Sequence, residues 1–102
     1  MKINFKVSLN VFGEEAKDQN GEIVYLNKTL ANLLGSNPHK DTGIGYMDAI
    51  TWATTINKGD LVDLEKSEQE ALKRFIESNE SLTAFAKANL IECFNTVPKE
   101  KG

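Results

Sequence analysis

The chain has 102 residues, of which 40% are hydrophobic and 26% are charged. This length and composition fit one small globular domain and are too apolar for a disordered tail. No apolar run reaches the roughly 20 residues that a membrane-spanning helix needs, and residues 1–6 alternate in polarity, unlike the apolar stretch of a signal peptide. A single cysteine excludes an intrachain disulfide and a cysteine-based zinc cluster. We therefore expect one cytoplasmic domain over residues 1–97, with residues 98–102 as a frayed tail.

The charge is slightly acidic and unevenly distributed. Twelve Lys and Arg residues against fifteen Asp and Glu residues give a net charge of −3, and residues 57–80 alone hold seven acidic and four basic side chains. The chain has no stripe of clustered Lys or Arg, which proteins that neutralise phosphates need, so we expect no nucleic-acid partner. The acidic segment has two interpretations. It is either a surface that faces a basic protein partner or a solvated helix face that keeps the protein soluble.

The first segment carries the clearest strand pattern. Over residues 2–12, apolar side chains alternate with polar ones, which predicts a strand with one row on the core and the other toward water. Asn20-Gly21 is a strong hairpin signal, because both residue types tolerate positive φ angles. We therefore predict a hairpin with its tip at Asp18–Gly21 and its second arm over residues 22–26. The first arm continues, bent at Gly13, to the start of that tip.

Two helices are predicted in the middle of the chain. Asn27 is a good helix-capping residue, leucines after it form a short apolar face, and Gly35 is a good helix end. Residues 36–43 have the composition of a loop. Residues 46–58 are interpreted as a helix, with a strand as the alternative because their threonines are weak helix formers. The apolar face predicted for this helix consists of Met47, Ile50, Ala53 and Ile56, with Trp52 beside it.

The second half of the chain predicts an extended piece and two further helices. Residues 61–64 are extended, and Ser67 with Glu70 matches a capping box at the start of a helix that ends at Ser78-Asn79. A broad apolar stripe predicts a last helix over about residues 80–95. Strands first and helices after them indicate the α+β class. The predicted fold is an N-terminal antiparallel β-hairpin of two or three strands, packed against three or four helices.

Few residues suit catalysis or metal binding. His39 is the only histidine in the sequence, and with Asp41 and the Gly-Ile-Gly of residues 43–45 it makes the loop 37–46 the candidate for a ligand-binding or enzymatic site. We favour a solvated loop, because the lysine of a Walker motif and a second metal-ligand motif are missing. Cys93 lies on an apolar stripe, where a cysteine acts as a small hydrophobe rather than a nucleophile. We therefore predict no catalytic residue, no metal and no cofactor.

A candidate protein-binding surface is drawn from aromatic, acidic and amide side chains. Trp52 is either an interface anchor or part of the core. Asn89 interrupts the last apolar stripe, where a polar residue either bonds a neighbouring backbone or marks the edge of an interface. The candidate interaction surface consists of Trp52, Asp60, Asp63, Glu65, Glu68 and Asn89.

The order of these motifs has a counterpart in other proteins. The motifs are Gly13, Lys17-Asp18, Asn20-Gly21, Tyr25-Leu26, Leu30, Leu33-Leu34, Leu61-Val62-Asp63-Leu64, Ser67 and Phe75-Ile76. Over residues 5–95 this pattern resembles small phage and prophage proteins of unassigned function, which have an N-terminal β-hairpin and C-terminal helices. Residues 37–57 depart from the pattern. The resemblance implies an architecture and an origin, and it implies no functional residue.

Together these observations lead us to expect a non-enzymatic phage or prophage accessory protein. It would act by protein–protein interaction in the host cytoplasm, binding or inhibiting a host factor. One alternative is a virion or tail-assembly component that forms homo-oligomers. Another is a small ligand-binding or enzymatic domain that uses the loop 37–46. No membrane association is expected.

Overall fold

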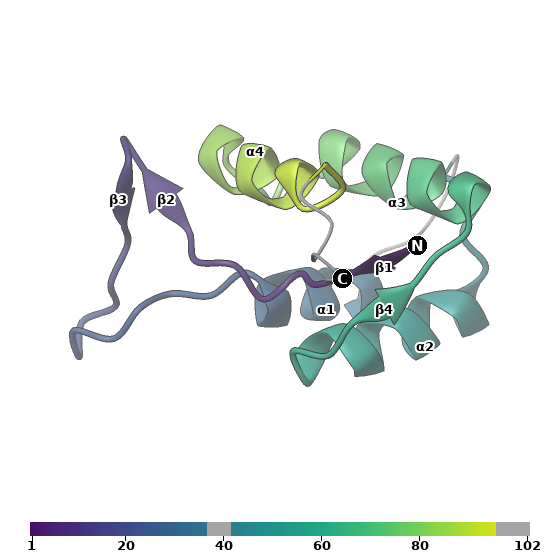
Figure 1. Cartoon of the computed structure of the whole chain (residues 1–102), viewed down its shortest axis with the longest axis horizontal. Helices are drawn as coiled ribbons and strands as arrows, with labels where there is room; N and C mark the ends of the chain where they lie inside the picture. Colours follow the sequence, from purple (N-terminus) through teal and green to yellow (C-terminus); the bar gives the residue numbers. More distant parts are fainter. Residues whose placement is uncertain (37–41, 96–102) are drawn as a thin grey trace, which may run out of the picture.

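The computed structural model describes residues 1–36 and 42–95, which form four helices and four short strands (Figure 1). The N-terminal segment runs between two pairs of helices, α3 with α4 and α1 with α2, and the β2–β3 hairpin extends beyond α1 and α2 on the side of α4 (Figure 1). This arrangement confirms the predicted α+β class with an N-terminal β-hairpin. In chain order the elements are β1 (Lys2–Ile3), β2 (Asn10–Val11), β3 (Glu14–Glu15), α1 (Asn27–Ser36), α2 (Tyr46–Asn57), β4 (Val62–Asp63), α3 (Lys66–Ser78) and α4 (Ala84–Glu92).

The first strand is shorter than the alternation predicts. Its inward row is correct at the start of the chain, because Ile3 and Phe5 are fully buried. However, β1 pairs antiparallel with β4, with Ile3 opposite Val62, and not with the predicted second arm over residues 22–26. The segment then changes partner, bonding to residues 22–26 in its middle and to β3 at its end. The prediction of one continuous strand over residues 2–12 is therefore wrong, because no single partner runs along its whole length.

Three extended segments meet in a ring of backbone hydrogen bonds. The Leu9 amide donates to the Val24 carbonyl at 2.9 Å, the Val24 amide donates to the Ala16 carbonyl at 3.0 Å, and the Ala16 amide donates to the Leu9 carbonyl at 2.8 Å. All three residues are half-buried. The ring satisfies their backbone groups without a regular sheet, which explains why strand pairing in this region is so short.

Two turns close this region. The β2–β3 hairpin turns at Phe12 and Gly13, whose φ angles of 55° and 82° match the two-residue turn preferred between antiparallel strands. The predicted tip at Asp18–Gly21 is a second turn, in which the Gly21 amide donates to the Asp18 carbonyl at 2.9 Å. Lys17 and Ile23 on either side of this turn form an antiparallel bridge, so Asp18–Gly21 is the tip between the two predicted arms. The β2–β3 hairpin is an additional turn within the first arm. The prediction missed this additional turn because Phe12, a bulky residue, adopts a positive φ that is typical of Asn or Gly.

α3 begins with a capping box, but not at the predicted residues. Its N-cap is Glu65, whose side chain accepts from the backbone of Glu68, while the Glu68 carboxylate accepts from the Glu65 amide at 2.8 Å. The box predicted at Ser67 and Glu70 is therefore wrong. The same physical pattern operates two residues earlier, where the extended backbone that leaves β4 ends.

α1 begins at the predicted residue through a different contact. Asn27 is buried, and its side-chain amide donates to the carbonyl oxygens of Ile56 and Asn57 at the end of α2, at 3.1 Å and 3.3 Å. The predicted capping role of this side chain is wrong, because the amide joins two helices instead of closing its own. Gly35, predicted as the residue after the helix, lies within α1.

The end of the chain folds into a shorter helix than predicted. α4 starts after Thr83, whose Oγ1 accepts from the Ala86 amide at 3.2 Å, so the preceding residues of the predicted 80–95 helix form a turn. The predicted tail over residues 98–102 lies outside the described residues.

One hydrophobic cluster joins the N-terminal segment to all four helices. Its most deeply buried large side chains are Ile3, Phe5, Leu30, Leu34, Ile56, Leu64, Leu72, Ile76 and Leu90. The Phe5 ring contacts the Phe94 ring edge to face, with centroids 5.4 Å apart. The helices are therefore held around the N-terminal segment, which positions the surfaces described below.

Candidate functional site

The outer face of α2 exposes three large apolar side chains. Tyr46, Met47 and Ile50 are 75%, 64% and 50% exposed. At about 100° per residue they lie within one sector of about 100° around the helix, so they form one continuous surface. We call these three residues the α2 face. Tyrosine and methionine are enriched where proteins meet, and a rigid helix holds them at fixed spacing.

The buried side of α2 differs from the predicted one. Ala49, Trp52 and Ile56 face the core, whereas Met47 and Ile50, predicted to be buried, face solvent. The reason is geometric: residues three apart drift by about 60° per step around an α-helix, so Met47 and Ile56 lie on opposite sides. Spacings of three and four residues connect Ala49, Trp52 and Ile56 on the buried face, but the sequence contains apolar residues on the outer face as well.

Trp52 therefore belongs to the core and not to the surface. Its side chain is only 7% exposed, which leaves little of it for a partner to contact. The exposed aromatic residue of this helix is Tyr46, which the sequence analysis did not select.

The β2–β3 hairpin also exposes an aromatic side chain, Phe12. The Phe12 ring packs edge to face on Phe85 of α4, with centroids 5.0 Å apart, although Phe12 is 87% exposed. This contact holds the tip of the β2–β3 hairpin against α4. The β2–β3 hairpin lies at the opposite end of the molecule from α2 (Figure 1).

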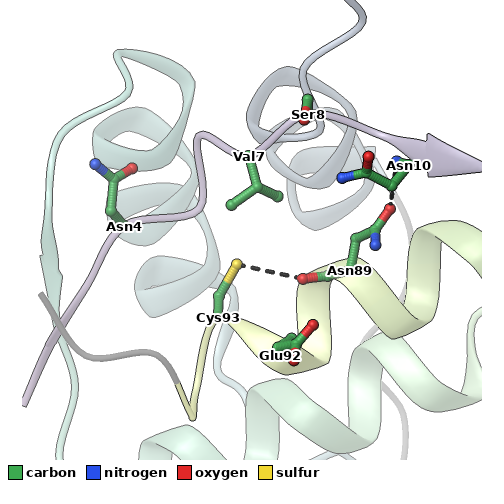
Figure 2. Close-up of a pocket in the computed structure, with 7 residues that line it drawn as sticks. All are labelled: Asn4, Val7, Ser8, Asn10, Asn89, Glu92 and Cys93. Atoms are coloured by element: carbon green, nitrogen blue, oxygen red, sulfur yellow. Dashed lines mark hydrogen bonds between the residues drawn. The ribbon is translucent and has the colours of Figure 1, made fainter. Parts of the chain in front are cut away.

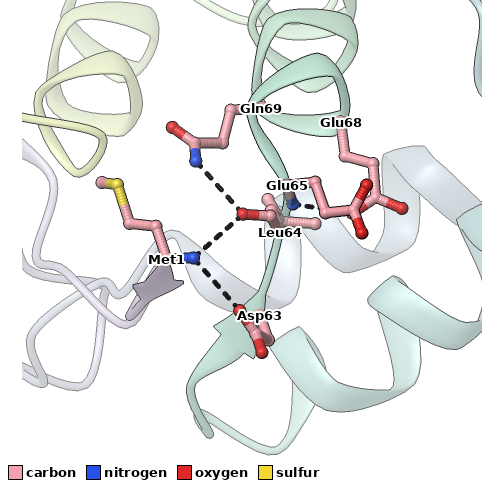
Figure 3. A network of polar contacts seen from close by, with 6 residues as sticks. All are labelled: Met1, Asp63, Leu64, Glu65, Glu68 and Gln69. Atoms are coloured by element: carbon pink, nitrogen blue, oxygen red, sulfur yellow. Dashed lines mark hydrogen bonds and ion pairs between the residues drawn. The ribbon is translucent and has the colours of Figure 1, made fainter.

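Three of the four acidic candidates make contacts within the fold (Figure 3). The Asp63 carboxylate accepts from the Met1 amino group at 3.2 Å, and Glu65 and Glu68 form the capping box of α3. The Asp63 side chain remains 71% exposed, and an ion pair this exposed contributes only about 0–1 kcal/mol. Asp60 is also exposed. These carboxylates support the junction between β4 and α3 and still present negative charge to solvent.

Asn89 bonds a neighbouring backbone, one of the two roles considered for it. Its Oδ1 accepts from the Asn10 amide at 2.8 Å and so ties α4 to β2 (Figure 2). A cavity of about 240 Å³ opens beside this bond. Its walls are Asn4, Val7, Ser8, Asn10, Asn89, Glu92 and Cys93. Most of these side chains are polar, and Glu92 is the charged residue among the described residues of the wall.

Cys93 is a buried thiol in the wall of this cavity. It is 5% exposed, and its Sγ donates to the Asn89 carbonyl at 3.5 Å (Figure 2). Burial raises the pKa of the Cys93 thiol to about 11. The thiol is therefore protonated at neutral pH and is a poor nucleophile. Its predicted burial is confirmed.

The candidate loop 37–46 is described only at its end. His39 and Asp41 lie outside the described residues. Thr42 is buried, and its carbonyl accepts from Arg74 Nη2 at 3.1 Å, which anchors the end of the loop to α3. Gly43 follows with a φ of 83°, a conformation that favours glycine.

The rest of the described structure offers two negative findings. Within residues 1–36 and 42–95, no group of three His, Cys, Asp or Glu side chains could hold a metal ion. In the same residues, no helix combines the length and the apolar character needed to cross a membrane. Comparisons with protein-family models, curated proteins and solved structures found no match to this chain.

Proposed function

We propose that this protein is a non-enzymatic accessory protein that acts by binding a protein partner through the α2 face. The observation that supports this function is the apolar character of both sides of one surface helix. The inner side is satisfied by the core, whereas Tyr46, Met47 and Ile50 are at least half exposed. Apolar side chains on a second, outward face of a helix are expected to be covered, because exposed apolar surface costs free energy.

The magnitude of this effect suits a specific interaction. Complete burial of one large apolar side chain contributes about 1.5–3 kcal/mol, and each residue of the α2 face is already partly covered. Covering the exposed parts of all three would therefore contribute about 3–5 kcal/mol before the costs of association. Aromatic and methionine anchors at helical spacing match the mode in which a helix enters an apolar groove of its partner.

The charge of this chain indicates which charge we expect around the apolar groove of the partner. Asp48 is exposed in the first turn of α2, and the chain as a whole carries a net charge of −3. Opposite charges around an apolar centre steer partners together. We therefore infer a partner with an apolar groove and a basic rim. The resemblance to small phage and prophage proteins supports a host protein as that partner.

The test uses matched charge-adding variants. Purified protein is used to capture partners from a host lysate, and the captured protein is then purified and titrated against each variant. Ile50→Glu should lower the affinity at least tenfold, whereas Phe12→Glu, which adds the same charge at the opposite end of the molecule, should leave it within about twofold. Thermal unfolding confirms that both variants fold. Equal losses for the two variants, or no loss for Ile50→Glu, would refute the α2 face as the binding surface.

The same variants distinguish binding of a host partner from the alternative, in which the protein forms homo-oligomers. Light scattering at increasing protein concentration measures self-association directly. A monomer that binds the captured partner supports the proposal. A dimer that Ile50→Glu dissociates would instead assign the α2 face to contacts between copies of this chain, and would refute a host partner at this surface.

A further inference from the structure

A cluster of lysines lines a second cavity, separate from the α2 face and from the cavity beside Cys93. Its volume is about 340 Å³, within the range of roughly 300–1,000 Å³ typical of small-molecule sites. It lies where the N-terminal segment, the start of α1 and the end of α2 meet. The residues that line it are Lys6, Tyr25, Asn27, Lys28, Asn57 and Lys58. Three are cationic and none is acidic, in a chain whose net charge is −3.

Lys6 is exposed, and two contacts position its side chain at the cavity. Its ammonium group lies 5.1 Å from the centroid of the Tyr25 ring, a cation–π distance. Its stem lies against Gly59, where an added Cβ would come within 3.2 Å of the Lys6 Cδ. Its backbone amide donates to Asn4 Oδ1 at 2.8 Å. A cation positioned in this way loses less side-chain entropy when it binds an anion.

The helix ends at the cavity also favour negative charge. Asn27 and Lys28 are the first two residues of α1, whose N-terminal end carries partial positive charge and amides without acceptors inside the helix. The opposing negative end of α2 is blocked, because the buried Asn27 amide donates to the carbonyls of Ile56 and Asn57. Two acceptors that would otherwise repel an anion are thus already occupied.

The three lysines of the cavity, Lys6, Lys28 and Lys58, have no carboxylate partner among the described residues. The one ion pair that the described residues form joins Met1 to Asp63. Like charges that share a cavity without a counterion repel one another. A bound anion removes this repulsion and gains charge-assisted hydrogen bonds.

We propose that this cavity binds the phosphate group of a small molecule. A phosphate dianion matches a concave site with several separate ammonium donors, because its oxygens accept from several directions at once. The cavity is larger than a single phosphate needs, and Tyr25 in its wall offers aromatic surface to an attached group. This binding activity is independent of the α2 face.

The test is a titration of the isotope-labelled full chain with inorganic pyrophosphate at constant ionic strength, followed by amide chemical shifts. Saturable one-to-one binding is expected, with the largest shifts at Lys6, Lys28 and Lys58. Lys6→Gln and Lys58→Gln should each weaken binding about fivefold or more. Lys17 is an exposed lysine that follows β3 and does not line the cavity. Lys17→Gln removes the same charge and should change the affinity less than twofold.

Further titrations distinguish the source of the phosphate. Inorganic phosphate, glucose 6-phosphate and adenosine 5′-monophosphate are compared at equal concentrations. Tighter binding of either organic compound assigns the cavity to phosphorylated metabolites, and equal affinities assign it to the phosphate group alone. Shifts that do not saturate, or a loss with Lys17→Gln as large as the loss with Lys6→Gln, would overturn the proposal.

Discussion

Substitutions of Asn27 test how α1 and α2 are joined. Its buried amide donates at 3.1 Å and 3.3 Å to two carbonyls at the end of α2, while its backbone begins α1. Replacing it by Ala removes both hydrogen bonds. At about 1 kcal/mol net for each bond, Asn27→Ala should lower the free energy of unfolding by about 2 kcal/mol.

Asn27→Asp separates this bridging role from an effect of the helix end. An aspartate in the first turn of α1 gains about 0.3–1 kcal/mol from the helix dipole. The same carboxylate places an oxygen against the carbonyls of Ile56 and Asn57, in a site that is only 4% exposed. Burying a carboxylate against two carbonyls costs several kcal/mol, which exceeds the gain from the helix dipole. The lysines of the neighbouring cavity are exposed, so water screens their attraction and does not let it offset this cost. Asn27→Asp should therefore be less stable than Asn27→Ala at neutral pH.

The assay is urea unfolding of the two variants and the native chain, followed by circular dichroism. The Asp variant has a second signature, because the surrounding carbonyls raise the pKa of its carboxyl in the folded state. Its stability should be recovered at acidic pH, below the pKa of the unfolded chain, and lost as the pH rises through the folded pKa. If Asn27→Asp proves more stable than Asn27→Ala at neutral pH, the helix dipole dominates and the bridge between α1 and α2 is refuted.

Three further predictions follow from burial and backbone geometry. Trp52→Ala should lower the free energy of unfolding by about 3–5 kcal/mol, and Ile50→Ser by less than about 0.5 kcal/mol. Urea unfolding measures both values. Similar losses for the two variants would contradict the assignment of the two faces of α2. The Cys93 thiol has its pKa raised from 9.0 to about 11, so the stability linked to its protonated form is complete below the lower value and is lost as the pH rises through the higher one. Between these two pH values, the free energy of unfolding should fall less for Cys93→Ala than for the native chain. Parallel curves of stability against pH would exclude this linkage. Gly59→Ala should destabilise the chain by about 1–2 kcal/mol, because its φ of 81° disfavours side chains and the new Cβ meets the Lys6 stem; an unchanged melting temperature would argue against this geometry.

The sequence predicted those features that depend on near neighbours in the chain. α2 was predicted as a helix, although its apolar spacing of three gave the wrong face, and the Asp18–Gly21 turn followed from the preferences of Asn and Gly. Burial of Ile3 and Phe5 followed from alternation, and burial of Cys93 from its place on an apolar stripe. In each case the deciding contacts lie within a few residues or on one face of one element.

Tertiary structure decided which partner each element meets. β1 pairs with β4, about sixty residues away, and the Asn27 amide bonds to α2 and not to its own helix. Both faces of α2 are apolar, so only the packed core determines that Trp52 is buried and Ile50 is left outside. The lysine cavity likewise exists only where Lys6 and Lys58, distant in the chain, are brought together. These outcomes depend on long-range packing free energy, which local patterns do not encode.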